Sequence, residues 1–484
     1  MNNYLPISND AAGANVQAGV NASGELAPAA AAKKSAILPA KVLGEAPQGH
    51  LAPISASTST ILGKPVFAVN TSPLNMNSGF RHKFLCDGGT FTPGTACAYS
   101  CPYCYVEAMV IKQEQVRDIL AASGKPFNEV VIRRNNAMQR LAQDLTRKTR
   151  KKEQIPAADK LLTPELIERW GLKNEWSLAG RFAKYAGPEW EGKIIYASPL
   201  VDVAATKVLA NETVEMCEVI LRLTGFHIRL LSKSPLLADV AEELARRLPD
   251  PRTGAKARMI LGFSTGTLND EVATAMEQHT PSPTARLKAL HRLQDAGYRT
   301  YGMLCPILPQ KDAAAYTAFA HAAMQAIRAE QCEEIWAEAV NFRAGGKKKK
   351  GDVNDRQQRN SFGATLHALT RGGFKEEAAL FDRVARDPAA WEGYSRALFE
   401  ALAEAAPEQT AGRLLIGEKA GVKRPNKLWW LHYPRRTASI TEYWEAQQGK
   451  GAVLLGAIVT WYRKAKGAKP DATAAAANNS GISG

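Results

Sequence analysis

Three cysteines within eight residues raise the question of what chemistry this chain performs. Cys97, Cys101 and Cys104 stand in the stretch CAYSCPYCY at 97–105, and the chain contains only seven cysteines. Thiolates bind zinc or iron–sulfur clusters. Because a closed zinc site usually takes four ligands, the missing fourth ligand decides whether the loop is structural or keeps one coordination position open for chemistry.

A structural zinc site is one interpretation of this loop. Such sites usually pair two CxxC motifs, or one motif with nearby histidines, and the sequence has no second CxxC. The other cysteines are isolated from one another: Cys86, Cys217, Cys305 and Cys332. His82 could complete a zinc site with Cys86 or with the three-cysteine loop, so this alternative stays open.

A [4Fe–4S] cluster is the second interpretation. The spacing CxxxCxxC allows one loop to ligate three irons of a cubane and leaves the fourth iron open. An open iron can be chelated by the amino and carboxylate groups of S-adenosylmethionine, and an electron from the reduced cluster then cleaves the sulfonium and releases a 5′-deoxyadenosyl radical. On this interpretation the missing ligand is S-adenosylmethionine itself.

Alternating strands and helices must position this loop. Short apolar runs predict strands at 193–198, 227–234, 258–265, 299–306 and 333–342. Amphipathic stretches predict intervening helices at 212–225, 237–248, 285–297 and 312–327. Gly297 is a regular stop for the third of these helices. The alternation predicts an α/β fold with βαβ units and a parallel sheet, either open or curled into a barrel.

Composition divides the rest of the chain. Residues 1–60 and 466–484 are rich in small and polar residues and lack a sustained apolar period, which predicts a disordered leader and tail. Residues 61–345 form the central domain, in which 106–192 is a mostly helical insertion. Residues 346–465 are expected to form a helical C-terminal extension.

The cysteine loop resembles the signature of the radical SAM superfamily, in which an aromatic residue, here Tyr103, precedes the last cysteine. The resemblance covers about residues 78–345. Four segments follow, in order, the pattern of the spore photoproduct lyase-like branch: ASPLVD (197–202), LLSKSPLLADV (230–240), 262–298 and CPILPQ (305–310). The resemblance implies a partial (β/α)6 barrel, a [4Fe–4S] cluster bound by the three loop cysteines, and S-adenosylmethionine as cofactor.

The carboxyl ends of the strands line the site of such a barrel. The polar residues at those ends are Ser198, Asp202, Ser232, Lys233, Ser234, Ser264, Thr265, Glu338 and Asn341. The resemblance implies that Lys233 pairs with the cofactor carboxylate and that Ser264 contacts the cofactor. We assign Tyr103, Ser198 and Asp202 to the same cofactor site, although polar residues at these places also serve as caps or fix loops. Arg286 is expected to pack on its helix or to neutralise Glu277.

One position departs from the family pattern. Spore photoproduct lyases carry a cysteine near the end of the second strand, which returns a hydrogen atom to the product radical, and Pro199 occupies that place here. Cys305, at the end of the fifth strand, is the candidate catalytic residue from another wall of the barrel. A small buried apolar role for Cys305 is the other interpretation.

Charge points to a polyanionic partner. Lys and Arg outnumber Asp and Glu by 62 to 47, a formal charge of +15, which favours nucleic acid or reflects a generally basic surface. The segments 130–152 and 423–444 are strongly basic, and the second interleaves cations with Trp429 and Trp430. Such segments can track phosphates and stack on exposed bases, unless the tryptophans fill a core.

These observations predict a radical SAM enzyme, lyase-like or modifying, that acts on nucleic acid in DNA repair or base modification. The alternatives are a radical SAM enzyme acting on a peptide or small metabolite, and a non-enzymatic binding protein holding zinc or a cluster. An electron donor such as flavodoxin or ferredoxin is expected. The sequence has no apolar run of about eighteen residues and no secretory signal, and its sparse cysteines argue against a disulfide framework, which together favour a cytoplasmic protein without a membrane partner.

Overall fold

The computed structural model describes residues 60–80, 85–145, 163–170, 187–340, 353–406, 413–417 and 427–432. The expected disordered leader and tail therefore lie outside the described residues, apart from the first strand residue, Thr60. None of the helices in these ranges combines the length and the hydropathy needed to cross a membrane.

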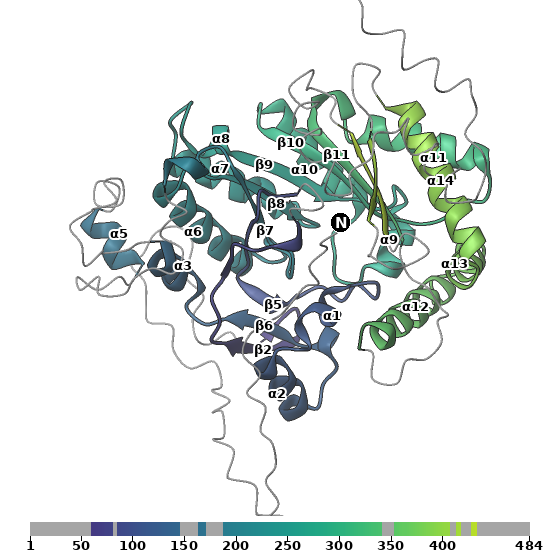
Figure 1. Ribbon diagram of the computed structural model, residues 1–484, viewed down its shortest axis with the longest axis horizontal. Helices are drawn as coiled ribbons and strands as arrows, with labels where there is room; N and C mark the ends of the chain where they lie inside the picture. Colours follow the sequence, from purple (N-terminus) through teal and green to yellow (C-terminus); the bar gives the residue numbers. More distant parts are fainter. Residues whose placement is uncertain are drawn as a thin grey trace, which may run out of the picture.

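One large mixed sheet organises the molecule (Figure 1). Its strands are β3 (Leu74–Asn75), β4 (Gly89–Phe91), β7 (Ile194–Ala197), β8 (His227–Ser232), β9 (Met259–Ser264), β10 (Arg299–Ile307), β11 (Cys332–Ala339), β12 (Arg413–Gly417) and β13 (Lys427–His432). The order across the sheet is β12-β13-β11-β10-β9-β8-β7-β4-β3. Strands β4 and β7 to β11 run parallel to their neighbours in this set, and β3, β13 and β12 add antiparallel edges.

The five strands expected from apolar runs are confirmed as β7 to β11, and β4 supplies a sixth parallel strand before the cysteine loop. This sheet agrees with the predicted α/β class. Within the described part of the chain the sheet ends at β3 and β12, which do not pair with each other, so barrel closure is not observed.

The crossover helices are also confirmed. The helices after successive parallel strands are α6 (Lys207–Leu223), α7 (Leu236–Arg247), α8 (Ala255–Arg258), α9 (Asp270–Met276), α10 (Pro283–Asp295) and α11 (Ala313–Ala326). In α10 the side chain of Ser282 accepts a hydrogen bond from the amide of Ala285, and Pro283 takes the first helical position. Gly297 follows the helix at φ +72°, which a glycine adopts without steric cost and which stops the helix as expected.

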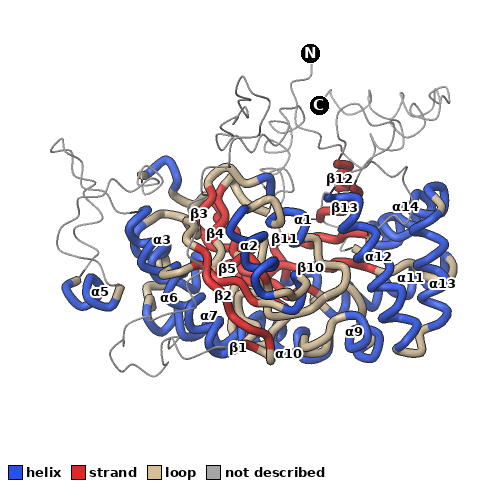
Figure 2. Tube along the Cα trace, turned by 90° about the horizontal axis from the view of Figure 1, so that it is seen from below, coloured by secondary structure: helices blue, strands red, loops and turns tan. Residues whose placement is uncertain are grey.

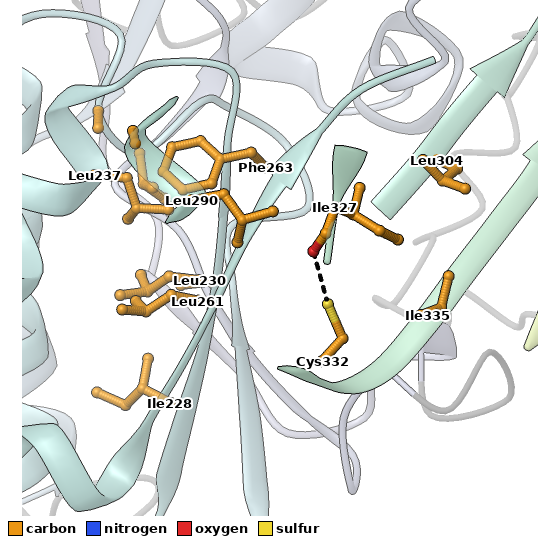
Figure 3. Packing of buried hydrophobic residues seen from close by; sticks show 14 of the residues in the cluster. Ile228, Leu230, Leu237, Leu261, Phe263, Leu290, Leu304, Ile327, Cys332 and Ile335 are labelled. Atoms are coloured by element: carbon orange, nitrogen blue, oxygen red, sulfur yellow. Dashed lines mark hydrogen bonds between the residues drawn. The ribbon is translucent and has the colours of Figure 1, made fainter. Parts of the chain in front are cut away.

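Alternation along the strands creates two buried faces. On one face Leu230 and Leu261 of neighbouring strands pack with Leu237 of α7 and Leu290 of α10, and Figure 3 shows Leu230 and Leu261 side by side. On the opposite face a separate apolar cluster consists of Leu85, Cys86, Tyr196, Ile260, Tyr301, Met303 and Trp336. Helices α6, α7 and α10 contribute residues to the first face and lie along one side of the strands in Figure 2, so the second face is the one available to line a site.

A second, smaller sheet lies beside the first and was not anticipated from the sequence. It has the order β1-β2-β6-β5, from β1 (Thr60–Ile61), β2 (Lys64–Val69), β6 (Val131–Arg134) and β5 (Gly94–Ala96). Strand β6 falls inside residues 106–192, so the expectation of a mostly helical insertion is incomplete there. The described helices of that segment are α1 (Val106–Val110), α2 (Glu114–Ser123), α3 (Ala137–Leu145) and α5 (Pro164–Arg169), with 3₁₀ turns at Phe127–Glu129 and Pro188–Trp190.

The C-terminal extension begins as predicted and ends differently. Helices α12 (Val353–Arg371), α13 (Lys375–Arg386) and α14 (Pro388–Ala405) form its first part. The chain then returns to the large sheet, where β13 pairs antiparallel with β11 and β12 with β13. The prediction that 346–465 is helical, and that 423–444 lies outside the barrel, is therefore wrong for β12 and β13, because these apolar runs satisfy their backbone groups on an open sheet edge.

Helix α14 is fixed to the strand ends by specific bonds. The hydroxyl of Tyr394 donates to the carbonyl of Ile307 and accepts from the amide of Val340 at 2.8 Å. The indole Nε1 of Trp391 donates to the carbonyl of Val340 at 3.1 Å. The extension thus packs against the carboxyl ends of β10 and β11 and belongs to the same structural unit as the sheet.

Candidate metal and cofactor site

The cysteine loop leaves the small sheet at the end of β5 and enters α1. Cys97, Cys101 and Cys104 are free thiols of intermediate burial, and the amide of Cys104 donates to the carbonyl of Cys101 at 3.1 Å in a tight turn. Burial raises the pKa of each thiol to about 12, and the thiols also raise one another's pKa by electrostatic interaction. The three side chains therefore share one neighbourhood, and any metal they bind must displace their protons.

The three thiols suit an iron–sulfur cluster better than a single metal ion. In the described ranges, no group of three or more His, Cys, Asp or Glu side chains is arranged to hold one metal ion. His82, the expected fourth ligand of a zinc site, lies outside those ranges. A four-iron cluster is ligated by thiolates that each bind a different iron, so three soft donors on one loop satisfy its chemistry without meeting at a point.

Glu277, just after α9, connects the cysteine loop to the ends of two strands. The hydroxyl of Tyr103 donates to Glu277 Oε1, and the ammonium of Lys233 reaches the same oxygen at 2.8 Å. Lys233 Nζ also donates to the hydroxyl of Ser264 at 3.0 Å and lies 5.6 Å from the centre of the Tyr103 ring. Three predicted cofactor residues, Tyr103, Lys233 and Ser264, thus meet around one carboxylate.

Arg286 completes this network from α10. Its Nη2 pairs with Glu277 Oε2, and its other nitrogens donate to the carbonyl of Ser264 at 2.9 Å and of Pro281 at 2.8 Å. Arg286 is 1 % exposed, and the prediction that it neutralises Glu277 is confirmed.

Glu277 is paired with two cations, and the carboxylate of Asp202 interacts electrostatically with one of them, Lys233. Burial acts to raise the pKa of Glu277, but the charges of Lys233 and Arg286, with hydrogen bonds from Lys233 and Tyr103, outweigh it and lower the pKa to about 2. One carboxylate therefore faces two cations. Among the described residues the Lys233 ammonium hydrogen-bonds with two acceptors, so one of its three N–H groups remains available to an anionic ligand.

Asp202 lies beside the loop but is held by the protein itself. Its carboxylate accepts from the hydroxyl of Ser232 at 2.7 Å, the amide of Lys233 at 2.7 Å and the amide of Ala204 at 2.9 Å. Its own amide donates to Cys97 Sγ at 3.3 Å. Burial raises the pKa of Asp202, and these hydrogen bonds oppose the rise. Asp202 is placed to position Cys97 and Lys233.

Ser198 takes part in a local structure at the end of β7. Its hydroxyl donates to Thr92 Oγ1 at 2.6 Å and accepts from the amide of Val201 at 3.3 Å. Ser198 is 7 % exposed, and these two hydrogen bonds fix the loop that carries Asp202.

Cys305 lies near the end of β10, the strand next to β9, which carries Ser264. Its Sγ is 3.8 Å from Glu338 Oε2, and its carbonyl accepts from the hydroxyl of Ser264 at 2.9 Å. The side chain is partly buried and packs against the apolar cluster that contains Tyr196 and Met303, so its placement agrees with both interpretations of Cys305. Asn341, the other expected residue at the end of β11, lies outside the described residues.

Tyr105 was missed by sequence reasoning. Its hydroxyl donates at 2.9 Å to the carbonyl of Pro199, the residue that stands in the place of the family cysteine, and the side chain is 44 % exposed. Its electrostatic neighbours include Cys104, Cys305 and Glu338. The sequence feature that could have indicated Tyr105 is the YCY stretch, which places a tyrosine on each side of Cys104.

The other three cysteines lie in the interior of the protein. Cys86, Cys217 and Cys332 are buried, and burial raises the pKa of Cys86 to about 11. Figure 3 shows Cys332 among aliphatic side chains, with Sγ donating to the carbonyl of Ile327 at 3.5 Å.

The described part of the first basic segment is largely committed to internal contacts. Arg133 is 7 % exposed and forms an ion pair with Glu212, while Arg134 donates to Thr71 and to the carbonyl of Ser72. These two arginines therefore do not offer free charge to a polyanion, in contrast to the expectation for this segment. Residues 146–152 lie outside the described residues.

The second basic segment meets the sheet at the site edge. In the pairing of β13 with β11, Trp429 is in register with Glu338 and Trp430 with Ala337. Arg435 and Arg436 lie outside the described residues. The backbone of β13 is therefore a neighbour of the strand that carries Glu338.

Comparison with known proteins gives structural similarity alone. No family model and no curated protein matches the chain. The structure is similar to that of spore photoproduct lyase. A tyrosine-to-phenylalanine mutant of that enzyme matches at 13% identity and a TM-score of 0.34, over 60% of this chain and 64% of the other. The match thus spans less than two thirds of that chain.

Two further structures of the same enzyme match over more of the chain. A cysteine-to-serine mutant has 14% identity and a TM-score of 0.36, over 67% of this chain and 72% of the other. A double mutant with bound AdoMet and dinucleoside spore photoproduct has 12% identity and a TM-score of 0.36, over the same fractions.

Proposed function

We propose that this chain is a radical SAM enzyme that binds a [4Fe–4S] cluster through Cys97, Cys101 and Cys104. One observation carries the proposal: the three free thiols adjoin a network of Lys233, Ser264 and Glu277 at the carboxyl ends of β8 and β9. A cluster with one open iron needs an anionic, chelating cofactor beside it, and the Lys233 ammonium, which has two acceptors among the described residues, can donate its third N–H group to such a cofactor. When bound, the reduced cluster and S-adenosylmethionine supply a 5′-deoxyadenosyl radical that abstracts hydrogen from a substrate.

The chain's own residues bind and orient the cofactor. Lys233 offers its remaining N–H group to the cofactor carboxylate, and Ser264 holds the Lys233 ammonium in place from β9. Glu277 accepts hydrogen bonds from both Lys233 and Tyr103. It therefore links the lysine that binds the cofactor to the residue before Cys104. Asp202 fixes Cys97 and the Lys233 backbone, and Ser198 fixes the loop of Asp202.

We assign Cys305 as the hydrogen-atom donor, with Glu338 as its neighbour. The support is placement: Cys305 is a partly exposed thiol whose carbonyl accepts from Ser264, the partner of Lys233, and it is electrostatically close to Tyr105. Cys305→Ser would keep a group of similar size without the weak S–H bond. The expected result is unchanged cofactor cleavage and an altered or stalled product, read by mass spectrometry.

Nucleic acid is the substrate class that the charge favours, with repair or base modification as the reaction. The support is the formal charge of +15 and the basic, aromatic 423–444 segment, part of which pairs with β11. A peptide or small metabolite is the second candidate, favoured by the internal pairing of Arg133 and Arg134. Binding of single strands measured against salt separates the two. For a nucleic-acid enzyme, Arg435→Ala combined with Arg436→Ala flattens the salt dependence, whereas absent or salt-independent binding selects the second candidate.

The decisive test of the proposed function is anaerobic reconstitution. We expect the reduced protein to contain about four irons and four sulfides and to convert S-adenosylmethionine, with flavodoxin, ferredoxin or dithionite as electron donor, to products that mass spectrometry detects. Zinc without iron or sulfide would instead establish the non-enzymatic binding protein.

A further inference from the structure

Lys64 is a buried lysine at the cysteine loop that has no role in the proposed cofactor site. It opens β2 directly after a two-residue turn in which Leu62 and Gly63 both have positive φ, 50° and 74°. Such turns favour a tight hairpin, which here places Lys64 opposite Ile61. The lysine is only 7 % exposed, so the hairpin directs its charge inward.

The ammonium of Lys64 ends on the cysteine loop. Nζ donates to the carbonyl of Ala98 at 2.6 Å, and Ala98 stands between Cys97 and Cys101. This is its one hydrogen bond with the described residues, and none of their carboxylates forms an ion pair with it. Around it, Ala98 packs in an apolar cluster with Ile61, Val131 and Leu209. A buried cation in such surroundings is costly unless a negative charge lies near it.

The negative groups that act on Lys64 are the loop thiols. Burial lowers the pKa of Lys64, and the charges of Cys97, Cys101 and Cys104, followed by that of Glu129, act in the opposite direction. Glu129 is exposed and already near Lys125, at 3.9 Å. The thiolate ligands of a cluster would therefore supply the compensating charge that the described residues lack around Lys64.

We propose that Lys64 sets the reduction potential of the cluster: its ammonium balances the negative charge of the thiolate-ligated cluster, and its bond to Ala98 holds the loop. The inference rests on the proposed function and adds a positioning residue from outside the large sheet. Net charge and hydrogen bonding near the thiolates are among the terms that set iron–sulfur potentials. Reduction adds one electron from an external donor, and the nearby positive charge stabilises that added negative charge, while Lys64 itself exchanges neither electron nor proton.

The test is a redox titration of the full-length reconstituted protein without S-adenosylmethionine, followed by electron paramagnetic resonance. Lys64→Met removes charge and hydrogen bond, Lys64→Gln removes the charge but keeps a donor, and Lys64→Arg keeps the charge. Lys288→Met is the matched control, because it removes a lysine charge from an exposed position on α10. We expect the Met and Gln variants to show an equilibrium constant for reduction about tenfold lower, which for one electron is about 59 mV, with Lys64→Arg and the control near wild type.

Equal potentials in wild type, Lys64→Met and Lys64→Gln would overturn the inference while leaving the proposed function standing, since all would contain iron and sulfide. Loss of the cluster from all three Lys64 variants, Lys64→Arg included, would also overturn it, because the role would then be steric and not one of charge. Wild-type protein without iron and sulfide would instead refute the proposed function, so the two failures are distinguishable.

Discussion

Two buried ion-pair groups lie at opposite ends of β8 and differ in the number of cations and carboxylates that they pair. Near the amino ends, Arg229 of β8 and Glu334 of β11 form a two-pronged pair with N–O distances of 3.3 and 2.6 Å, each side chain 3 % exposed. Tyr301 covers this pair, its ring centre 5.1 Å from the guanidinium. At the carboxyl end, Glu277 stands between two cations, and Lys233 keeps 13 % exposure.

The difference separates a structural ion pair from the proposed cofactor site. In the Arg229–Glu334 pair one positive and one negative charge cancel, and burial of both makes the pair a fixed support between β8 and β11. In the Glu277 network one carboxylate pairs with two cations, and the more exposed cation, Lys233, also interacts with the carboxylate of Asp202. Lys233 directly follows β8 and is four residues after Arg229, so the two side chains lie on the same face of the sheet. The ion pair of Arg229 and the proposed site at Lys233 are therefore aligned along one strand.

The largest expected effect concerns the cysteine loop. Alanine at Cys97, Cys101 or Cys104 should abolish cluster binding, because a cubane loses a ligand that the loop cannot replace. Iron and sulfide analysis after anaerobic reconstitution measures this. Cys217→Ala, a buried cysteine of α6 far from the loop in sequence, is the control and should retain full iron content. Full iron in a loop variant would contradict the assignment.

The next largest effect is expected for the buried ion pair of Arg229 and Glu334. Arg229→Met should lower the free energy of unfolding by about 3–5 kcal/mol, because Glu334 would keep an uncompensated buried charge. Denaturant unfolding of the metal-free protein measures it. Replacing both partners, with Arg229→Met and Glu334→Leu together, should recover most of the loss. A double variant as unstable as the single one would show that the pair does more than cancel charge.

A smaller effect is expected for Lys233 in the Glu277 network. Lys233→Met should weaken S-adenosylmethionine binding by about 1.5–3 kcal/mol through loss of a charged hydrogen bond. Its cost in stability should be below that of Arg229→Met, because Glu277 still pairs with Arg286. Calorimetric titration of the reconstituted protein gives the affinity, with Lys288→Met as the surface control. Unchanged affinity would make Lys233 a structural residue like Arg229.

The smallest effect is a pH dependence. Glu277 has a pKa lowered from 4.5 to about 2, so its contribution to stability is present above pH 4.5 and is lost as the pH falls toward 2. Glu277→Gln should therefore flatten the stability of the metal-free protein over that interval. Glu243, whose pKa is also about 2 but which is only partly buried beside Arg246 and Arg247, is the control and should change the slope less. Equal slopes in the Glu277 variant and wild type would contradict the charge assignment.

The sequence by itself determined the parts of this protein that depend on local pattern. The CxxxCxxC spacing predicts a ligand loop, and the apolar runs and helical periods predict β7 to β11 and their crossover helices, because side-chain spacing reports secondary structure directly. The polar residues at strand ends followed from the same pattern, since parallel strands present their carboxyl ends together.

Only the tertiary structure decided which of these residues meet. Tyr103, Lys233 and Arg286 converge on Glu277 from positions as much as 174 residues apart, and no local period encodes such a contact. For the same reason the sequence did not predict three further contacts: the pairing of β13 with β11, the ion pair that buries Arg133, and the hydrogen bond from Lys64 to Ala98. Each depends on the packing of distant segments, which fixes whether a charge is solvated, neutralised or held against the ligand loop.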